Sequence, residues 1–145
     1  SPNPFCREDI GGPFGAAVIA ENGDILAVTS NSVLRDNDPT AHAEVNAIRA
    51  ACKKAGSYDL SGCVLYTTAY PCPMCLSAII WANIKKVYFG CRPEDAEHIG
   101  FRDDFMYRFI EGKCKDKTVL DMAELDRDEC LRLFAEYKQK AKTIY

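Results

Sequence analysis

The sequence predicts an α/β domain in which helices cover a mixed sheet, and three observations predict this fold. Apolar segments at residues 14–20 and 25–30 flank Asn22-Gly23, a dipeptide typical of tight β-hairpins. Strand-like and helix-like segments then alternate between residues 38 and 91. The chain has 145 residues, of which 48% are hydrophobic, so it can bury a core of its own. We therefore expect one domain over residues 1–145.

The N-terminal third is expected to form an antiparallel hairpin. The first ten residues show no helical apolar period, and Gly11-Gly12-Pro13 is a turn signal. Residues 14–20 and 25–30 are the predicted strands, with Asn31 ending the second. Residues 35–38 read as a polar loop.

A helix is expected from Asp38-Pro39 to about Ala55. Aspartate is a good N-cap, proline favours the first helical position, and Gly56 is a suitable C-cap. Its apolar residues recur every three or four positions and predict a core-facing stripe: Ala41, Val45, Ile48, Cys52 and Ala55. This assignment places His42 and Glu44 in the first turn.

The remaining elements follow the same reasoning. Residues 63–68 and 86–91 are predicted strands, and residues 75–83 are a predicted helix between them. Residues 92–106 read as a loop, and residues 118–122 as a last short strand. Asp126 and Glu129 resemble a capping box, which opens a helix to about Lys142 with one apolar face: Leu131, Phe134, Tyr137 and Ala141.

Three residues have the spacing and chemistry of a zinc site. Cys72 and Cys75 are separated by two residues and can bind the same ion, and His42 supplies a third ligand. Two thiolates and an imidazole favour tetrahedral zinc, with the fourth position left for water. His-x-Glu followed by Pro-Cys-x-x-Cys is typical of zinc-dependent deaminases, in which the glutamate, here Glu44, carries protons.

Other interpretations of these residues are possible. Cys72 and Cys75 fit a redox pair, although that reading leaves the His-x-Glu segment without a role. A structural zinc site would need a fourth protein ligand, for which Cys63 and Cys91 are the candidates. His42 also fits an ordinary capping or core histidine.

The chemistry expected of a catalytic site is hydrolysis. Zinc lowers the pKa of water, which then attacks a ring carbon bearing an exocyclic amine. Glu44 takes the proton of the water and delivers it to the ring nitrogen and the leaving amine. The backbone around Ala43 and Cys72 is expected to orient the substrate.

The composition excludes several other classes. With 18 basic and 21 acidic residues, the net charge of -3 gives no general attraction to nucleic acid or to anionic membranes. No apolar run approaches the roughly 20 residues needed to span a bilayer, and no secretory signal is recognisable at the N-terminus. The eight cysteines are scattered among apolar neighbours, which favours free thiols and a cytoplasmic location.

Four stretches of the chain resemble the cytidine-deaminase-like superfamily, and within it the bacterial-type guanine deaminases. The stretches are residues 11–16, 37–44 and 71–75, together with Gly100-Phe101 followed by Asp103 and Phe105. The resemblance covers most of the chain from Gly11 to about Ile110. The zinc motifs are typical of the superfamily as a whole, whereas the stretch from Gly100 points to the guanine branch.

The resemblance implies a three-layer α-β-α fold with a five-stranded mixed sheet, and a homodimer that exchanges its C-terminal segments. It also implies roles for further residues. Asn31 would bind the base, Phe14 would line the pocket, and Trp81 would pack near the ring. Asp103 would be a second proton shuttle, and Tyr145 would close the pocket from the partner chain. For Phe14 and Trp81 plain core packing is an equal alternative, and Asp103 also fits a solvated loop carboxylate.

The chain departs at two places from the pattern of the family that it resembles. Tyr70 stands where guanine and transfer-RNA adenosine deaminases have glutamate, and no amphipathic helix is recognisable before Gly11. The leading hypothesis is a zinc-dependent deaminase of a free nucleobase, in purine metabolism, that converts guanine to xanthine and ammonia. Tyr70 keeps open cytosine or a related aminopyrimidine or triazine as substrate. Two further alternatives are transfer-RNA adenosine deamination and a non-catalytic, zinc-stabilised interaction domain.

Overall fold

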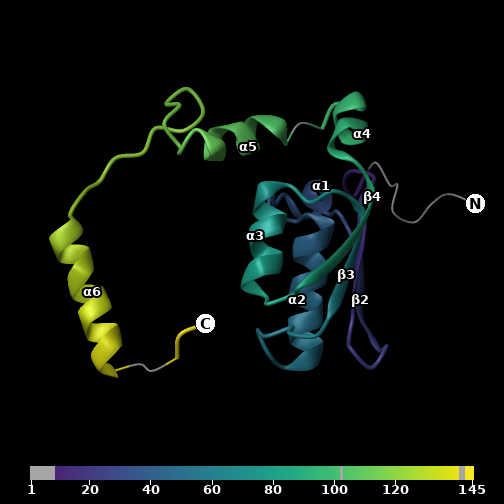
Figure 1. Cartoon of the computed structure of the whole chain (residues 1–145), viewed down its shortest axis with the longest axis horizontal. Coiled ribbons are helices and arrows are strands. Elements are labelled where there is room, and N and C mark those ends of the chain that lie inside the picture. Colours follow the sequence, from purple (N-terminus) through teal and green to yellow (C-terminus); the bar gives the residue numbers. More distant parts are fainter. Residues whose placement is uncertain (1–8, 102, 141–142) are drawn as a thin grey trace, which may run out of the picture. The chain divides into compact units, whose positions relative to one another are not determined.

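The computed structural model describes residues 9–101, 103–140 and 143–145. The chain divides into two units, residues 1–105 and residues 106–145. The first unit contains a sheet with helices packed on it (Figure 1). Residues 1–8 include most of the segment for which the sequence predicts irregular structure, and they lie outside the described residues.

The sheet of the first unit is mixed, with the strand order β2-β1-β3-β4. The strands are β1 (Gly15–Ile19), β2 (Ile25–Ser30), β3 (Val64–Ala69) and β4 (Lys86–Cys91). β1 pairs antiparallel with β2 and β3, and β3 pairs parallel with β4. The predicted hairpin is confirmed, with Gly23 at a φ of +93° in its turn.

The expected fifth strand is wrong for the described residues, which form four. Residues 118–122, predicted as a strand, form a turn and irregular chain. The Asp116 carboxylate accepts hydrogen bonds from the backbone N–H and the hydroxyl of Thr118, at 3.0 and 2.6 Å. This local turn withdraws backbone groups that a strand would need for pairing.

Helices α2 (Ala43–Ala55) and α3 (Pro73–Trp81) cover one face of the sheet (Figure 1). The buried side chains of α2 include Ala43, Ala47 and Ala51, which join Val18 and Leu65 in one apolar cluster. Because alanine side chains are short, the α2 backbone lies close to the strands. The end of α2 is as predicted, since Gly56 adopts the left-handed conformation at its C-cap.

The start of α2 differs from the prediction. The helix begins at Ala43 rather than at Asp38-Pro39, and His42 is its N-cap instead of a first-turn residue. The Asp38 carboxylate accepts hydrogen bonds from the backbone N–H and the hydroxyl of Thr40, at 2.8 and 2.7 Å. Asp38 therefore closes a tight turn instead of capping the helix.

Three helices overlap segments where the sequence predicts loop. They are α1 (Val33–Asp36), α4 (Pro93–His98) and α5 (Asp104–Glu111). α1 and α4 are too short to show an apolar period. α4 carries a local start signal, because Pro93 occupies the first turn and the backbone N–H of Arg92 donates to the Asp95 carboxylate at 2.8 Å.

The second face of the sheet carries a cross-strand row of exposed and partly exposed side chains. Val28, Ala17, Tyr66 and Tyr88 are successive partners across the four strands. Tyr66 and Tyr88 stack with ring centroids 5.2 Å apart, and both are about half exposed. Within the described residues of the first unit, α2 and α3 cover one face of the sheet, so the three-layer arrangement stays a prediction.

The second unit contains most of α5 and all of α6 (Arg127–Lys140). The predicted helix from Asp126 is confirmed to Lys140, whereas residues 141–142 lie outside the described residues. The apolar side chains Leu131, Phe134 and Tyr137 of α6 are all exposed. Over the described ranges, we find no helix with the length and apolar character needed to cross a membrane.

Candidate metal centre and active-site cavity

The predicted metal ligands are brought together by the starts of two helices. β3 ends at Ala69, and two residues later the chain enters α3 with Cys72 as N-cap and Pro73 in the first turn. The backbone N–H of Cys75 donates to the Cys72 sulfur at 3.5 Å. His42 occupies the equivalent N-cap position of α2, with an extended backbone.

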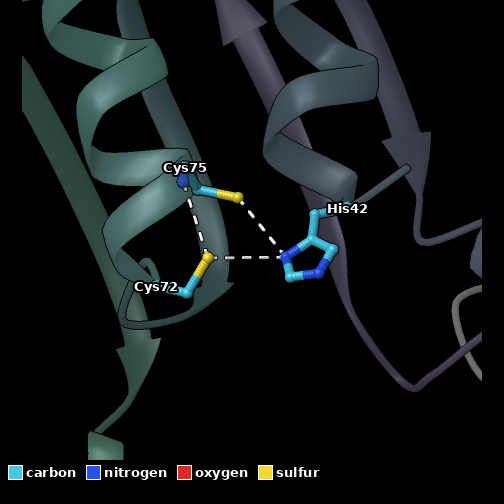
Figure 2. Close-up of side chains that lie close together, drawn as sticks. All are labelled: His42, Cys72 and Cys75. Carbon is cyan, nitrogen blue, oxygen red and sulfur yellow. Dashed lines mark hydrogen bonds between the residues drawn. The ribbon is translucent and has the colours of Figure 1, made fainter. Parts of the chain in front are cut away.

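The three side chains point toward one another from α2 and α3 (Figure 2). The His42 Nδ1 atom lies 3.6 Å from the Cys72 sulfur and 3.5 Å from the Cys75 sulfur. In a tetrahedral zinc site the nitrogen–sulfur edge is about 3.5 Å, given bonds of about 2.3 Å to sulfur and about 2.0 Å to nitrogen. The two nitrogen–sulfur distances therefore match those of a zinc site.

The ligand set is that of an open site. Among the described residues, the group able to hold a metal consists of His42, Cys72 and Cys75 alone. Cys63 is buried in the apolar cluster, and Cys91 is exposed at the end of β4. Neither candidate for a fourth ligand joins the site, as a closed structural zinc would require.

The electrostatics around the sulfurs favour one thiolate in the metal-free protein. A hydrogen bond from the Cys75 side chain, assisted by His42 and by the Cys75 backbone N–H, lowers the pKa of Cys72 to about 4. The same pairing raises the pKa of Cys75. The hydrogen bond to Cys72 also raises the pKa of His42. A thiolate at a helix N-terminus is a strong zinc ligand.

Glu44 lies beside the metal ligands, in the first turn of α2. Its side chain is buried, with 6% of the residue exposed. Burial raises the pKa of its carboxyl, and a hydrogen bond with Cys75 opposes that shift. A carboxyl with a raised pKa next to the open metal position is suited to accepting and releasing a proton.

A cavity of about 490 Å³ opens over this centre. Seven of the predicted site residues line it: Phe14, Asn31, His42, Ala43, Glu44, Cys72 and Asp103. Burial raises the pKa of the Asp103 carboxyl, with a smaller contribution from Cys72. Asp103 is partly buried, and its role as a second proton shuttle stays a prediction.

Two predicted substrate residues are not brought into this cavity. Trp81 is the last residue of α3, is 66% exposed and does not line the cavity. Its predicted place near the ring of the base stays a prediction. Tyr145 belongs to the second unit, so its role at the pocket stays a prediction.

The amide of Asn31 has a defined orientation. Its oxygen accepts hydrogen bonds from the backbone N–H groups of Gly12 and Val33, at 3.3 and 3.1 Å. Because both partners are donors, the oxygen faces them, and the NH₂ group is the end of this cavity-lining amide that can donate to a ligand. Gly11 is essential here, since a Cβ at this position would lie 2.2 Å from that oxygen.

Aromatic rings form the rim of the cavity. Phe14 and Phe101 meet edge to face, with ring centroids 4.9 Å apart. Tyr70, the residue that departs from the family, also lines the cavity and packs edge to face on Phe89 at 5.1 Å. The Gly11-Gly12 contact and Phe101 were not predicted as site features, although both stretches belong to recognised motifs.

Comparison with known proteins gives consistent results. Residues 6–91 match the model of the cytidine and deoxycytidylate deaminase zinc-binding region. The chain is 52% identical to the guanine deaminase of Bacillus subtilis (strain 168) over 110 residues, covering 76% of this chain and 70% of that protein. The X-ray structure of a guanine deaminase from Bacillus subtilis superposes with a TM-score of 0.86 at 43% identity, covering 94% of this chain and 85% of the other.

A second group of relatives is named for a different substrate. The chain is 43% identical to the tRNA-specific adenosine deaminase of Aquifex aeolicus over 88 residues. This match covers 61% of the chain and 56% of that protein, so it spans little more than half of the relative.

Proposed function

The chain belongs to the cytidine and deoxycytidylate deaminase family of zinc-dependent hydrolases, and we propose on that basis that it converts guanine and water to xanthine and ammonia. The observation that carries the reaction type is the buried Glu44 carboxyl beside three metal ligands in an accessible cavity. The choice of guanine is supported by the 52% identity to a guanine deaminase over 70% of its length.

His42, Cys72 and Cys75 would hold the metal. Zinc bound there supplies Lewis acidity that lowers the pKa of water. Glu44 accepts a proton from the attacking water and donates it to N3 of guanine, the ring nitrogen next to the reacting C2. The second proton of the attacking water, moved by Glu44 with Asp103 as second shuttle, goes to the exocyclic amine. The C2–N bond then breaks, ammonia leaves, and the C2–O bond becomes the carbonyl of xanthine.

Substrate orientation follows from the donors and rings of the cavity. The Asn31 NH₂ group donates to an acceptor of the base, such as O6 or N7 of guanine, on the edge away from C2. Phe14 and Phe101 pack against the planar ring, which favours a base over an aliphatic amide. The backbone at Ala43 lines the same space and is assigned to orienting the base.

The ammonia-release assay tests this proposal most directly. Zinc-loaded protein is assayed against guanine, cytosine, isocytosine, adenine, their nucleosides and transfer RNA. We expect guanine to give the highest kcat/KM, with xanthine formed in equal amount to ammonia. Turnover of cytosine but not guanine would assign the enzyme to pyrimidines and would identify Tyr70 as the residue to investigate. No ammonia from any substrate would favour a zinc-stabilised interaction domain.

We further propose that the enzyme is a cytoplasmic homodimer in which Tyr145 of each chain completes the cavity of its partner. The seven described cysteines are free, which supports a reducing compartment. The exposed Ile80 and Trp81 at the end of α3 support an interface between copies.

The exchange of Tyr145 is tested by subunit complementation. Glu44→Gln and a chain lacking Tyr145 are each expected to be nearly inactive alone. A refolded mixture regains activity, because the mixed dimer contains one site with an intact Glu44 and the Tyr145 of the other chain. Failure to regain activity would contradict the exchange, and a monomer by light scattering would contradict the dimer.

A further inference from the structure

The side chain of Asn46 lies one helical turn beyond His42 on α2, and it is not one of the cavity-lining residues. Its Nδ2 atom donates to the backbone oxygen of Ser30 and to the hydroxyl of Ser32, both at 2.9 Å. A longer contact of 3.4 Å joins it to the backbone oxygen of Ala41. Because all three partners accept, the orientation of this amide is unambiguous.

The partners of Asn46 flank two residues of the site. Ser30 and Ser32 are the neighbours of Asn31 on either side, and Ala41 directly precedes His42. In addition, the backbone N–H of Asn46 donates to the carbonyl oxygen of His42 at 2.9 Å. Asn46 is thus hydrogen-bonded to both neighbours of Asn31 in the chain. It is also hydrogen-bonded to His42 and to the residue that precedes His42.

The surrounding hydrogen bonds keep this arrangement in place. The Ser32 hydroxyl accepts from Asn46 and donates to the Asp36 carboxylate at 2.7 Å. The backbone N–H of Ser32 donates to the Ala41 oxygen at 2.9 Å, so the two segments also meet directly. Nearby, the Thr29 hydroxyl donates to the carbonyl oxygen of Ala43 at 2.8 Å, which fixes the start of α2 on β2.

We propose that Asn46 is a positioning residue that sets the distance between the base-binding donor of Asn31 and the metal ligand His42. Asn31 follows β2, whereas His42 caps α2, so no shared element holds them together. Since the Asn31 donor has to meet the base while its reacting carbon faces the metal and Glu44, a small shift between the two segments misaligns the substrate. This inference rests on the proposed function, because it assigns Asn31 to base binding.

The test is a double-mutant cycle between Asn46 and Asn31. Asn46→Ala is expected to lower kcat/KM for guanine by about 10- to 100-fold in zinc-saturated protein, well below its unfolding temperature. In an Asn31→Ala background the same substitution is expected to change kcat/KM by less than about 3-fold, because the donor that it positions is already absent. Asn46→Asp, which replaces the donor by an acceptor at equal size, is expected to resemble Asn46→Ala.

A binding measurement separates positioning from loss of turnover. In a Glu44→Gln background, Asn46→Ala is expected to weaken binding of the guanine analogue 8-azaguanine by at least about 10-fold, with zinc content unchanged. Asn22→Ala removes an exposed hairpin amide with two local hydrogen bonds and serves as the matched control, with binding unchanged.

Three outcomes would overturn the proposal. These are a lower unfolding temperature with normal kcat/KM and binding, equal effects of Asn46→Ala with and without Asn31, and loss of zinc as the sole defect. If wild-type protein does not turn over guanine, the proposed function fails. The same cycle then tests the coupling with whichever base of the panel is deaminated.

Discussion

At the scale of single residues, Glu44 and the three ligands have separable roles. Glu44 follows His42 by two positions, but it is not in the group of side chains that could hold the metal. Glu44→Gln is therefore expected to fold and to retain one zinc per chain, while kcat falls by about 10²- to 10⁴-fold. Zinc content and steady-state kinetics measure this, with the exposed Glu21→Gln as control. Normal kcat in Glu44→Gln would contradict the assigned proton transfer.

Gly11 provides a second test at this scale. A Cβ on Gly11 would lie 2.2 Å from the Asn31 side-chain oxygen and 2.5 Å from its backbone oxygen, so Gly11→Ala has to displace Asn31. We expect KM to rise about tenfold or more and the free energy of unfolding to fall by about 1–3 kcal/mol.

Gly56→Ala is the matched control for Gly11→Ala. Position 56 has open space around it but a φ of +67°, so this change should cost about 1 kcal/mol of stability and leave KM unchanged. Chemical denaturation measures the stability of both variants, and steady-state kinetics measures their KM for guanine. Equal KM values would show that Gly11 has no part in placing Asn31.

At the scale of elements, the small helix α1 contributes to the folding stability of the protein in a pH-dependent way. The Arg35 guanidinium and the Ser32 hydroxyl, both hydrogen-bonded to Asp36, lower the pKa of its carboxyl below its ordinary value. Stability from this ionised carboxyl is present above the unfolded-state pKa of about 3.9 and is lost as pH falls through the lower folded-state pKa.

Asp36→Asn should therefore lower the Tm at neutral pH, and the difference from wild type should shrink below about pH 4. Thermal unfolding of both proteins from pH 3 to 7 measures this, with the exposed Asp24→Asn treated in parallel. A difference that stays constant across this range would contradict an electrostatic role for Asp36.

How well each element is predicted depends on whether its signal is periodic or local. The hairpin, β3, β4 and the end of α2 follow from alternation, β-branched residues and Gly56, and the sequence predicts them closely. The start of α2 is wrong because Asp38 is as good a turn former as an N-cap, and its bonds to Thr40 decide between the two. The metal ligands do not depend on that boundary, because their motif fixes residue types and spacing.

At the scale of the whole molecule, a metal bound by His42, Cys72 and Cys75 would connect the starts of α2 and α3. The ligands come from the starts of α2 and α3, so removal of zinc should loosen both helix termini. We expect a chelator to lower the Tm by about 10 °C at metal concentrations about 1,000-fold above Kd, with recovery when zinc is returned. Cys75→Ser should show little chelator sensitivity. An unchanged Tm in the wild-type protein would contradict a bound metal at this site.

What the sequence predicts less well is tertiary in origin. Asn31 was assigned by resemblance, whereas the orientation of its amide depends on Gly12 and Val33 and has no signature in the sequence. Asn46 is one polar residue on a helix, and its three acceptors come from segments that meet only after folding. For Trp81 the resemblance implies a place near the ring of the base, whereas its side chain is exposed in the first unit.

The spacing of the ligands also sets an order of assembly. Cys72 and Cys75 are three residues apart, whereas His42 is 30 residues from Cys72. Closing a loop ten times longer costs about 2 kcal/mol more in chain entropy, so a folding chain captures the metal first with its cysteine pair. Docking of α2 beside α3 then brings His42 to this pair. A complete set of three ligands thus indicates that α2 has docked beside α3. An ion bound by two sulfurs alone indicates a chain in which α2 has not yet docked.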